Sequence, residues 1–151
     1  MNFDKYISPL SDEKLLQACA KIKHVALDMD GTIYLGSTLF PYTQAFLQAL
    51  SDNGISYSFL TNNPTKSSKD YLAKLQKLGI NATEEQMYTS SIATIDYLHM
   101  QYPKAKRIFT LGTPSMQAEF IKAGFEITSD SADDAPDVLV VAFDTTLEYS
   151  R

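Results

Sequence analysis

The length, composition and charge of the chain favour a globular protein and exclude some classes of partner. The sequence has 151 residues, 44% of them hydrophobic, which suits one domain with a substantial buried core. The 18 acidic and 13 basic residues give a formal charge of -5, and no dense Lys/Arg cluster is present. Because nucleic-acid-binding proteins concentrate positive charge, we expect no nucleic-acid partner.

The N-terminal residues and the hydropathy pattern predict a cytoplasmic protein with no membrane partner. The stretch MNFDKYISPLSDEK contains acidic and polar residues where a secretory signal needs a basic start and an apolar run. No run of about 18 consecutive apolar residues is present that could form a membrane-spanning helix.

The first predicted elements are a helix and a strand. A capping Ser followed by acidic residues predicts an opening helix over 11–22. Cys19, the only cysteine, excludes an internal disulfide, and its apolar helical surroundings predict a buried small side chain. The run HVALDMD predicts a strand over 25–28 that is buried on both faces and ends in carboxylates.

Helices and strands alternate along the rest of the chain. A helix over 41–53 is followed by Gly54, a common left-handed helix stop, and then by a strand over 55–61. Further helices are predicted over 68–78, 89–102 and 114–123.

Two further apolar runs complete the predicted architecture. The runs at 107–111 and 138–143 predict buried strands, and the polar stretch 129–137 before the second run predicts a loop. Strands that alternate with helices favour right-handed crossovers and a mostly parallel sheet, so the predicted fold class is α/β. The final residues LEYSR look like the start of another helix.

Two carboxylates follow the first predicted strand. In Asp28-Met29-Asp30-Gly31 the acids are two residues apart, and Gly31 lets the chain leave extended geometry there. Both acids can then reach the crevice beyond the strand ends, where open α/β sheets bind ligands. This pattern fits an oxygen-ligated cation, although Asp is also common in turns and caps, so the pair alone decides nothing.

The end of the second strand adds neutral hydrogen-bonding groups to the same edge of the sheet. Thr61, Asn62 and Asn63 supply a hydroxyl, two amides and backbone N–H groups. An acidic pair beside a cluster of neutral donors is what a metal-bound phosphate requires. The two strand ends together therefore favour phosphate chemistry over simple turn roles.

These residues resemble the first two motifs of the haloacid dehalogenase superfamily, in which DxDGT closes one strand and Ser/Thr closes the next. The strings LDMDGTIYLG and FLTNNPTKSSKDYLAKLQKLGI are similar to the NagD-like, or p-nitrophenylphosphatase-like, branch in particular. The resemblance implies a Rossmann-like parallel-sheet core over 1–88, and the first part of an inserted α/β cap domain over 89–151.

The resemblance also implies roles for the site residues. Asp28 would be the nucleophile that carries an aspartyl-phosphate, and Asp30 would be the general acid and base. Mg²⁺ would bind a carboxylate oxygen of Asp28 and the backbone carbonyl of Asp30. Thr61 would hold a phosphate oxygen through its hydroxyl, with Asn62 and Asn63 completing the substrate-binding group.

Two elements that the family uses are not matched in this sequence. One is a Lys that neutralises the phosphate, and the other is an acidic cluster that completes the metal site. The lysines after the second motif are predicted to be solvated surface residues: Lys66, Lys69, Lys74 and Lys77. We therefore expect either a fragment of a longer phosphatase, proteolytic or designed, or a family member whose departure impairs catalysis.

The predicted function is Mg²⁺-dependent hydrolysis of a small phosphorylated metabolite. Within the superfamily, an acid at position 30 favours phosphate esters over dehalogenation. A phosphomutase shares this chemistry, and a non-catalytic module that binds Mg²⁺ and phosphate, or a receiver-like regulatory module, is the alternative from another class. The substrate stays open, and the apolar surface exposed by half a cap allows a homo-oligomer.

Three other features are predicted to have structural roles. His24 and His99 have no partner at metal-ligand spacing, so neither is expected to bind a metal. The stretch 112–115 lacks the full glycine fingerprint of a dinucleotide site, which favours a plain strand-to-helix turn.

Overall fold

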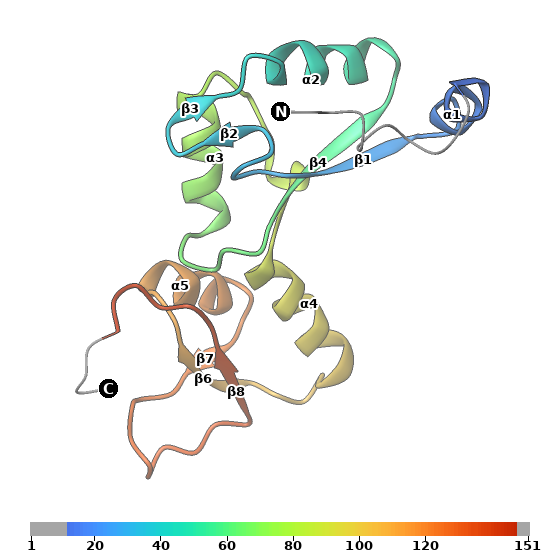
Figure 1. The fold of residues 1–151 in the computed structure, drawn as a ribbon. Helices are drawn as coiled ribbons and strands as arrows, with labels where there is room; N and C mark the ends of the chain where they lie inside the picture. The colour runs from blue at the N-terminus through green and yellow to red at the C-terminus, as the bar shows by residue number, and fades with distance from the viewer. Residues whose placement is uncertain (1–11, 148–151) are drawn as a thin grey trace.

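Two separate three-stranded sheets organise the part of the chain that the computed structural model describes, residues 12–147 (Figure 1). The first sheet, with the helices α2 and α3, lies above the second sheet, with α4 and α5, in the view of Figure 1. A short helix, α1 (Asp12–Cys19), precedes the first sheet. Both sheets are parallel, as the alternation of strands and helices predicts.

The first sheet has the strand order β1-β4-β5. Its strands are β1 (His24–Asp28), β4 (Ser56–Thr61) and β5 (Met87–Thr89). Asp28 lies opposite Leu60, and Thr61 lies opposite Thr89, so the three strands end at nearly the same level. The connections run through α2 (Thr43–Asp52) and through α3 (Ser68–Lys77) with the 3₁₀ helix η2 (Glu84–Gln86).

A small antiparallel hairpin follows β1 and was not predicted. It consists of β2 (Tyr34–Leu35) and β3 (Thr38–Leu39), joined through Gly36 at φ 58°. Strands of two residues are too short to show the alternation of apolar and polar residues on which sequence prediction depends. The hairpin nevertheless buries Tyr34 in the core of the first unit.

The second sheet has the strand order β7-β6-β8. Its strands are β6 (Arg107–Leu111), β7 (Glu126–Ile127) and β8 (Val138–Val141). The helices are α4 (Ser90–Gln101) and α5 (Pro114–Lys122). The predicted polar loop at 129–137 contains no helix or strand.

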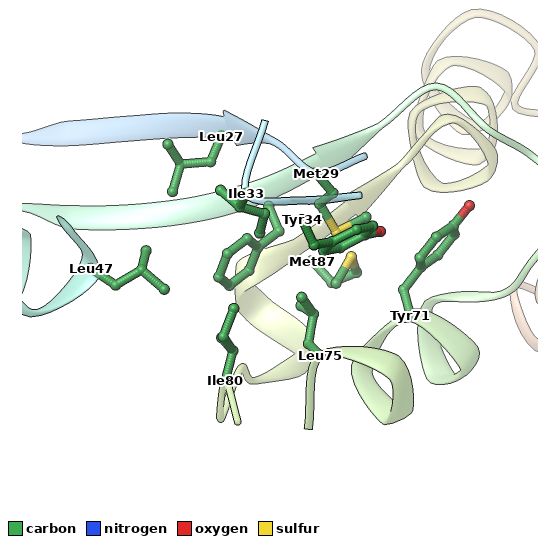
Figure 2. Close-up of a cluster of buried hydrophobic side chains, with 10 residues drawn as sticks. Leu27, Met29, Ile33, Tyr34, Leu47, Tyr71, Leu75, Ile80 and Met87 are labelled. Atoms are coloured by element: carbon green, nitrogen blue, oxygen red, sulfur yellow. The ribbon is translucent and has the colours of Figure 1, made fainter. Parts of the chain in front are cut away.

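Each sheet has its own hydrophobic cluster, formed on one face. In the first unit the buried strand residues Leu27, Phe59 and Met87 are in register and face the helices and the hairpin. Figure 2 shows this cluster, in which Leu75 and Tyr71 of α3 lie below the strands. The cluster of the second unit joins α4 and α5 to the sheet through Ile95, Leu98, Ile108, Met116, Phe120, Phe125 and Val140.

Local signals placed the helix ends of the first unit correctly. Ser67 and Asp70 form a reciprocal capping box at the start of α3. Gly54 and Gly79 follow α2 and α3 with φ values of 65° and 82°, a left-handed conformation that favours glycine. The two predicted helices are therefore confirmed to within a few residues.

Predictions of burial were less successful than predictions of secondary structure. Cys19 is exposed, so the expected buried thiol is wrong. The helix α1 ends at Cys19, earlier than the expected end at residue 22, and the predicted capping residue Ser11 lies outside the described residues. The helix predicted over the final LEYSR also lies almost wholly outside them.

The strands were predicted to be buried on both faces, and this is also wrong. In β1 the side chains of His24, Ala26 and Asp28 are exposed, and in β8 Leu139 and Val141 are exposed. The physical reason is that, within residues 12–147, the helices of each unit pack on one face of its sheet. A continuous apolar run therefore predicted each strand correctly. It did not predict whether a second layer packs on the other face of that strand.

Candidate functional site

A polar cleft of about 770 Å³ lies where the three strands of the first sheet end. Carboxyl ends of parallel strands are the usual ligand-binding edge of an α/β sheet. All five residues predicted for the site line this cleft: Asp28, Asp30, Thr61, Asn62 and Asn63. The structure therefore brings together the two strand ends that the sequence indicated.

The turn after β1 directs both acidic side chains to the open side of the sheet. Asp28 and Asp30 are exposed, whereas Met29 between them is fully buried. Gly31 has φ 86°, and its N–H donates to the carbonyl of Tyr34 at 2.7 Å, which closes the turn. The hydroxyl of Thr32 donates to Oδ2 of Asp28 at 2.9 Å and so orients that carboxylate.

The loop after β4 folds around its own side chains. The N–H of Asn63 donates to Oγ1 of Thr61 at 3.2 Å, and the N–H of Thr65 donates to Oδ1 of Asn63 at 3.0 Å. The hydroxyl of Tyr71 on α3 donates to the carbonyl of Asn63 at 3.0 Å. The N–H of Asn63, one of the groups expected to face a ligand, is thus used within the loop.

The donor groups at the strand ends suit a magnesium ion. Mg²⁺ prefers oxygen ligands and commonly takes one or two carboxylates while it keeps several waters. Asp28 and Asp30 supply two exposed carboxylates at one edge of the cleft. Within residues 12–147 no group of three or more His, Cys, Asp or Glu side chains could hold a metal.

Lys74 lies over the Tyr34 ring, within the electrostatic influence of Asp30, which was not expected. Its Nζ lies 3.8 Å from the centre of the Tyr34 ring, a cation–π contact, and its side chain is partly buried. Burial lowers the pKa of Lys74, while the nearby charge of Asp30 raises it. The prediction of a solvated surface lysine is therefore wrong for Lys74, although Lys66, Lys69 and Lys77 are exposed as expected.

Tyr34 shares this electrostatic environment. Burial raises its pKa to about 12, and the charges of Asp30 and, less strongly, Asp28 act in the same direction. The phenol beside the acidic pair therefore stays neutral at physiological pH. No sequence pattern marked Tyr34 or Lys74, because their proximity to Asp30 depends on how the hairpin packs against α3.

The second unit contacts the segment that follows the Thr61–Asn63 loop. Oε1 of Glu119 on α5 accepts hydrogen bonds from the N–H and the hydroxyl of Ser68, at 2.6 and 2.5 Å. The hydroxyl of Thr113 donates to the carbonyl of Thr65 at 3.0 Å. The second unit is thus hydrogen-bonded to the segment that joins the Thr61–Asn63 loop to α3.

Sequence reasoning missed the wall of the cleft formed by β5 and the start of α4. Tyr88, Thr89, Ser90 and Ala93 line it, and the phenol of Tyr88 donates to Asp96 at 3.0 Å. Thr89 is the N-cap of α4 and accepts from the N–H of Ile92. The sequence shows this N-cap residue as a helix start, whereas the three-residue strand before it is too short to predict.

The features predicted to be structural have structural contacts. The two ring nitrogens of His24 lie 2.8 and 2.9 Å from the hydroxyls of Ser56 and Ser58. The ring of His99 stacks on Phe125. Thr113 caps α5 through the N–H of Met116, so this segment is a strand-to-helix turn.

Fold and cleft together define an α/β protein with paired carboxylates and neutral hydrogen-bonding groups at the carboxyl end of a parallel sheet. A model of the haloacid dehalogenase-like hydrolase family matches residues 25–126, and the chain belongs to this family. The superfamily resemblance of the two strand-end motifs is thereby confirmed.

Similar proteins include several phosphatases. The acid sugar phosphatase of Staphylococcus aureus is 31% identical over 129 residues, which are 85% of this chain and 48% of that protein. The structure of 4-nitrophenylphosphatase from Thermotoga maritima has a TM-score of 0.78 at 33% identity, and the match covers 87% of this chain and 48% of that one. The p-nitrophenylphosphatase-like branch of the resemblance is supported at this level.

A further solved structure carries a metal. Glycerol phosphate phosphatase from Mycobacterium tuberculosis, in complex with magnesium, has a TM-score of 0.74 at 27% identity. The match covers 86% of this chain and 39% of that one. The chain spans about half the length of the curated relatives it matches.

Proposed function

We propose that this chain carries the nucleophile and the phosphate-binding loop of a Mg²⁺-dependent phosphatase that hydrolyses small phosphomonoesters. One observation supports this most strongly: Asp28 and Asp30 line the same cleft as Thr61 and Asn62. The names of the similar proteins, which are sugar, nitrophenyl and glycerol phosphate phosphatases, point to the same class of substrate.

In the first step the carboxylate of Asp28 attacks phosphorus. The new O–P bond forms as the bond to the ester oxygen breaks, and the carboxylic acid of Asp30 gives its proton to the leaving alkoxide. The hydroxyl of Thr32, which donates to Oδ2 of Asp28, favours attack by the other carboxylate oxygen. The hydroxyl of Thr61 and the backbone of Asn62 hold the phosphate oxygens.

In the second step the carboxylate of Asp30 takes a proton from water, and that water attacks phosphorus. The bond between phosphorus and Asp28 breaks, inorganic phosphate leaves, and both acids return to their starting protonation states. A positioned acid and base of this kind contributes about 10²–10⁴-fold to the rate.

Magnesium, when bound, offsets the negative charge of the phosphate. A carboxylate oxygen of Asp28 and the backbone carbonyl of Asp30 would hold it, with water as the other ligands. The exposed position of both acids leaves room for these waters.

The organisation around this site is also part of the proposal. Residues 1–88 form the first part of the hydrolase core, and residues 89–151 form the first part of a cap over the cleft. The partner is a small phosphorylated metabolite, the location is cytoplasmic, and self-association can occur through exposed apolar side chains such as Leu139 and Val141. None of the helices described in residues 12–147 has the length and apolar character needed to cross a membrane.

The experiment that tests the function is Mg²⁺-dependent release of p-nitrophenol from p-nitrophenyl phosphate. Asp28→Asn should abolish turnover, because an amide is a poor nucleophile for phosphorus. The matched control is Asp52→Asn, which makes the same chemical change at an exposed residue of α2 and should leave the rate unchanged. Undiminished turnover in Asp28→Asn would overturn the proposal.

If the chain shows no turnover, the second candidate function is favoured: a non-catalytic module that binds Mg²⁺ and phosphate. The observation that favours it is the absence of a third acidic ligand near the cleft within residues 12–147. Titration with Mg²⁺ and inorganic phosphate, followed by NMR, would detect such binding. The same assay on a longer natural chain that contains this segment would then show whether hydrolysis needs further residues.

A further inference from the structure

We propose that Tyr71 is a positioning residue, which holds the Thr61–Asn63 loop in the shape that binds the phosphate group. The inference rests on the proposed function and adds a residue to it. Tyr71 lies on α3, outside both strand-end motifs, and does not line the cleft.

The side chain of Tyr71 joins the hydrophobic core to the loop. It is only 4% exposed, and its ring belongs to the buried cluster of the first unit. Figure 2 shows its oxygen directed away from Leu75 and Met87. A buried phenol requires a hydrogen-bond partner, and Tyr71 finds its partner in the carbonyl of Asn63 at 3.0 Å.

The protonation state of this phenol suits a hydrogen-bond donor. Burial raises the pKa of Tyr71, and the neighbouring Thr61 side chain opposes this effect more weakly. The net pKa is raised, so the phenol keeps its proton and remains a donor at neutral pH. The Tyr71 hydroxyl can therefore hold the carbonyl of Asn63, the last residue of the loop, in place.

The support for Tyr71 is rigid. Its helix begins with the capping box of Ser67 and Asp70, and Leu75, one turn later, is fully buried. A loop that leaves a strand irregularly has few regular backbone hydrogen bonds, so a fixed external donor reduces its freedom. Binding groups held in place before the ligand arrives are worth more than groups that must be ordered on binding.

The test replaces Tyr71 by Phe, which removes the hydroxyl and keeps the ring in the core. Tyr57→Phe is the matched control, because Tyr57 packs at the edge of the same cluster from β4. Two quantities are measured on the whole 151-residue chain: amide hydrogen exchange at Asn62, Asn63 and Thr65, and the affinity for inorganic phosphate with Mg²⁺ present. Where turnover is measurable, KM and kcat for p-nitrophenyl phosphate are compared.

We expect Tyr71→Phe to speed loop exchange and to weaken phosphate binding by about three- to tenfold each, the scale of one hydrogen bond. KM should rise more than kcat falls, and the exchange of core amides such as that of Phe59 should change little. A merely structural role predicts instead faster exchange across the whole sheet and an unchanged KM. Unchanged loop exchange, or unchanged phosphate affinity despite faster loop exchange, would overturn the proposal.

Failure of the proposed function gives a different result. Absence of both turnover and phosphate binding in the unsubstituted chain would overturn the phosphatase assignment. Loop exchange, which needs no ligand, would still decide whether Tyr71 holds the loop.

Discussion

The two sheets of this molecule differ in the face that their helices leave uncovered. In the first sheet this face is polar, since His24 bridges the hydroxyls of Ser56 and Ser58. In the second sheet it is apolar, with Leu139 and Val141 exposed by 66% and 73%. Two parallel three-stranded sheets with different strand orders can therefore present different chemistry to their surroundings, because only one face of each packs against its hydrophobic cluster.

The causes of shifted pKa values also differ between the two units. Tyr34, Tyr71 and Lys74 all have shifted pKa values that involve burial and the charge of Asp30. In the second unit the shifted pKa values of Arg107, Asp134 and Asp137 are caused mainly by hydrogen bonds. The pKa shifts caused mainly by burial therefore cluster around Asp30 in the first unit.

The largest effect is expected from removing a core phenylalanine in each unit. Phe59 in the first cluster and Phe120 in the second are both fully buried, so either change to Ala should cost about 3–5 kcal/mol of unfolding free energy. Because the clusters are separate, each change should lower amide protection mainly in its own sheet. Amide hydrogen exchange measures this, with the exposed Phe46→Ala as the control.

Equal loss of protection in both sheets from either substitution would contradict this view. The contacts of Glu119 with Ser68 and of Thr113 with Thr65 would then couple the units into one cooperative structure.

A smaller effect is expected at alkaline pH, and only in the first unit. The pKa of Tyr34 is raised from 10.0 to about 12, mainly by burial. Below pH 10 the phenol is neutral in both the folded and the unfolded chain. Between about pH 10 and 12 only the unfolded chain loses this proton, so the free energy of unfolding falls, by about 3 kcal/mol in all.

Urea unfolding at pH 9, 10 and 11 measures this pH dependence. Tyr34→Phe should make the fall shallower but not abolish it, because burial also raises the pKa of Tyr71. The lowered pKa of Lys74 acts in the opposite sense and favours folding as pH rises. An unchanged slope in Tyr34→Phe would show that Tyr34 is not the group responsible; Tyr57→Phe is the control.

The smallest effect on stability is expected at the apolar face of the second sheet. Leu139→Ser should change the free energy of unfolding by less than about 0.5 kcal/mol, because the side chain is exposed in the folded chain. It should reduce concentration-dependent self-association, which sedimentation velocity measures. Val140→Ser, at the adjacent buried position of β8, should be clearly destabilising. A large loss of stability from Leu139→Ser would mean that this face is covered in solution.

Much of the fold could be predicted because its signals are local. The capping residues of α3 and the glycines that follow α2 and α3 act within one or two turns of their own helix. The five predicted residues of the cleft follow directly from two strand ends, since parallel strands end at a common edge. Strands of two or three residues, such as β2, β3 and β5, were missed because they are too short for a periodic pattern.

The sequence by itself determined the α/β alternation and the placing of carboxylates and neutral donors at adjacent strand ends. Only the tertiary structure decided that Lys74 lies over Tyr34, that Tyr71 reaches the carbonyl of Asn63, and that Cys19 is exposed. The physical reason is that helix capping and strand ends depend on neighbours in the chain, whereas burial and side-chain contacts depend on which faces of different elements meet.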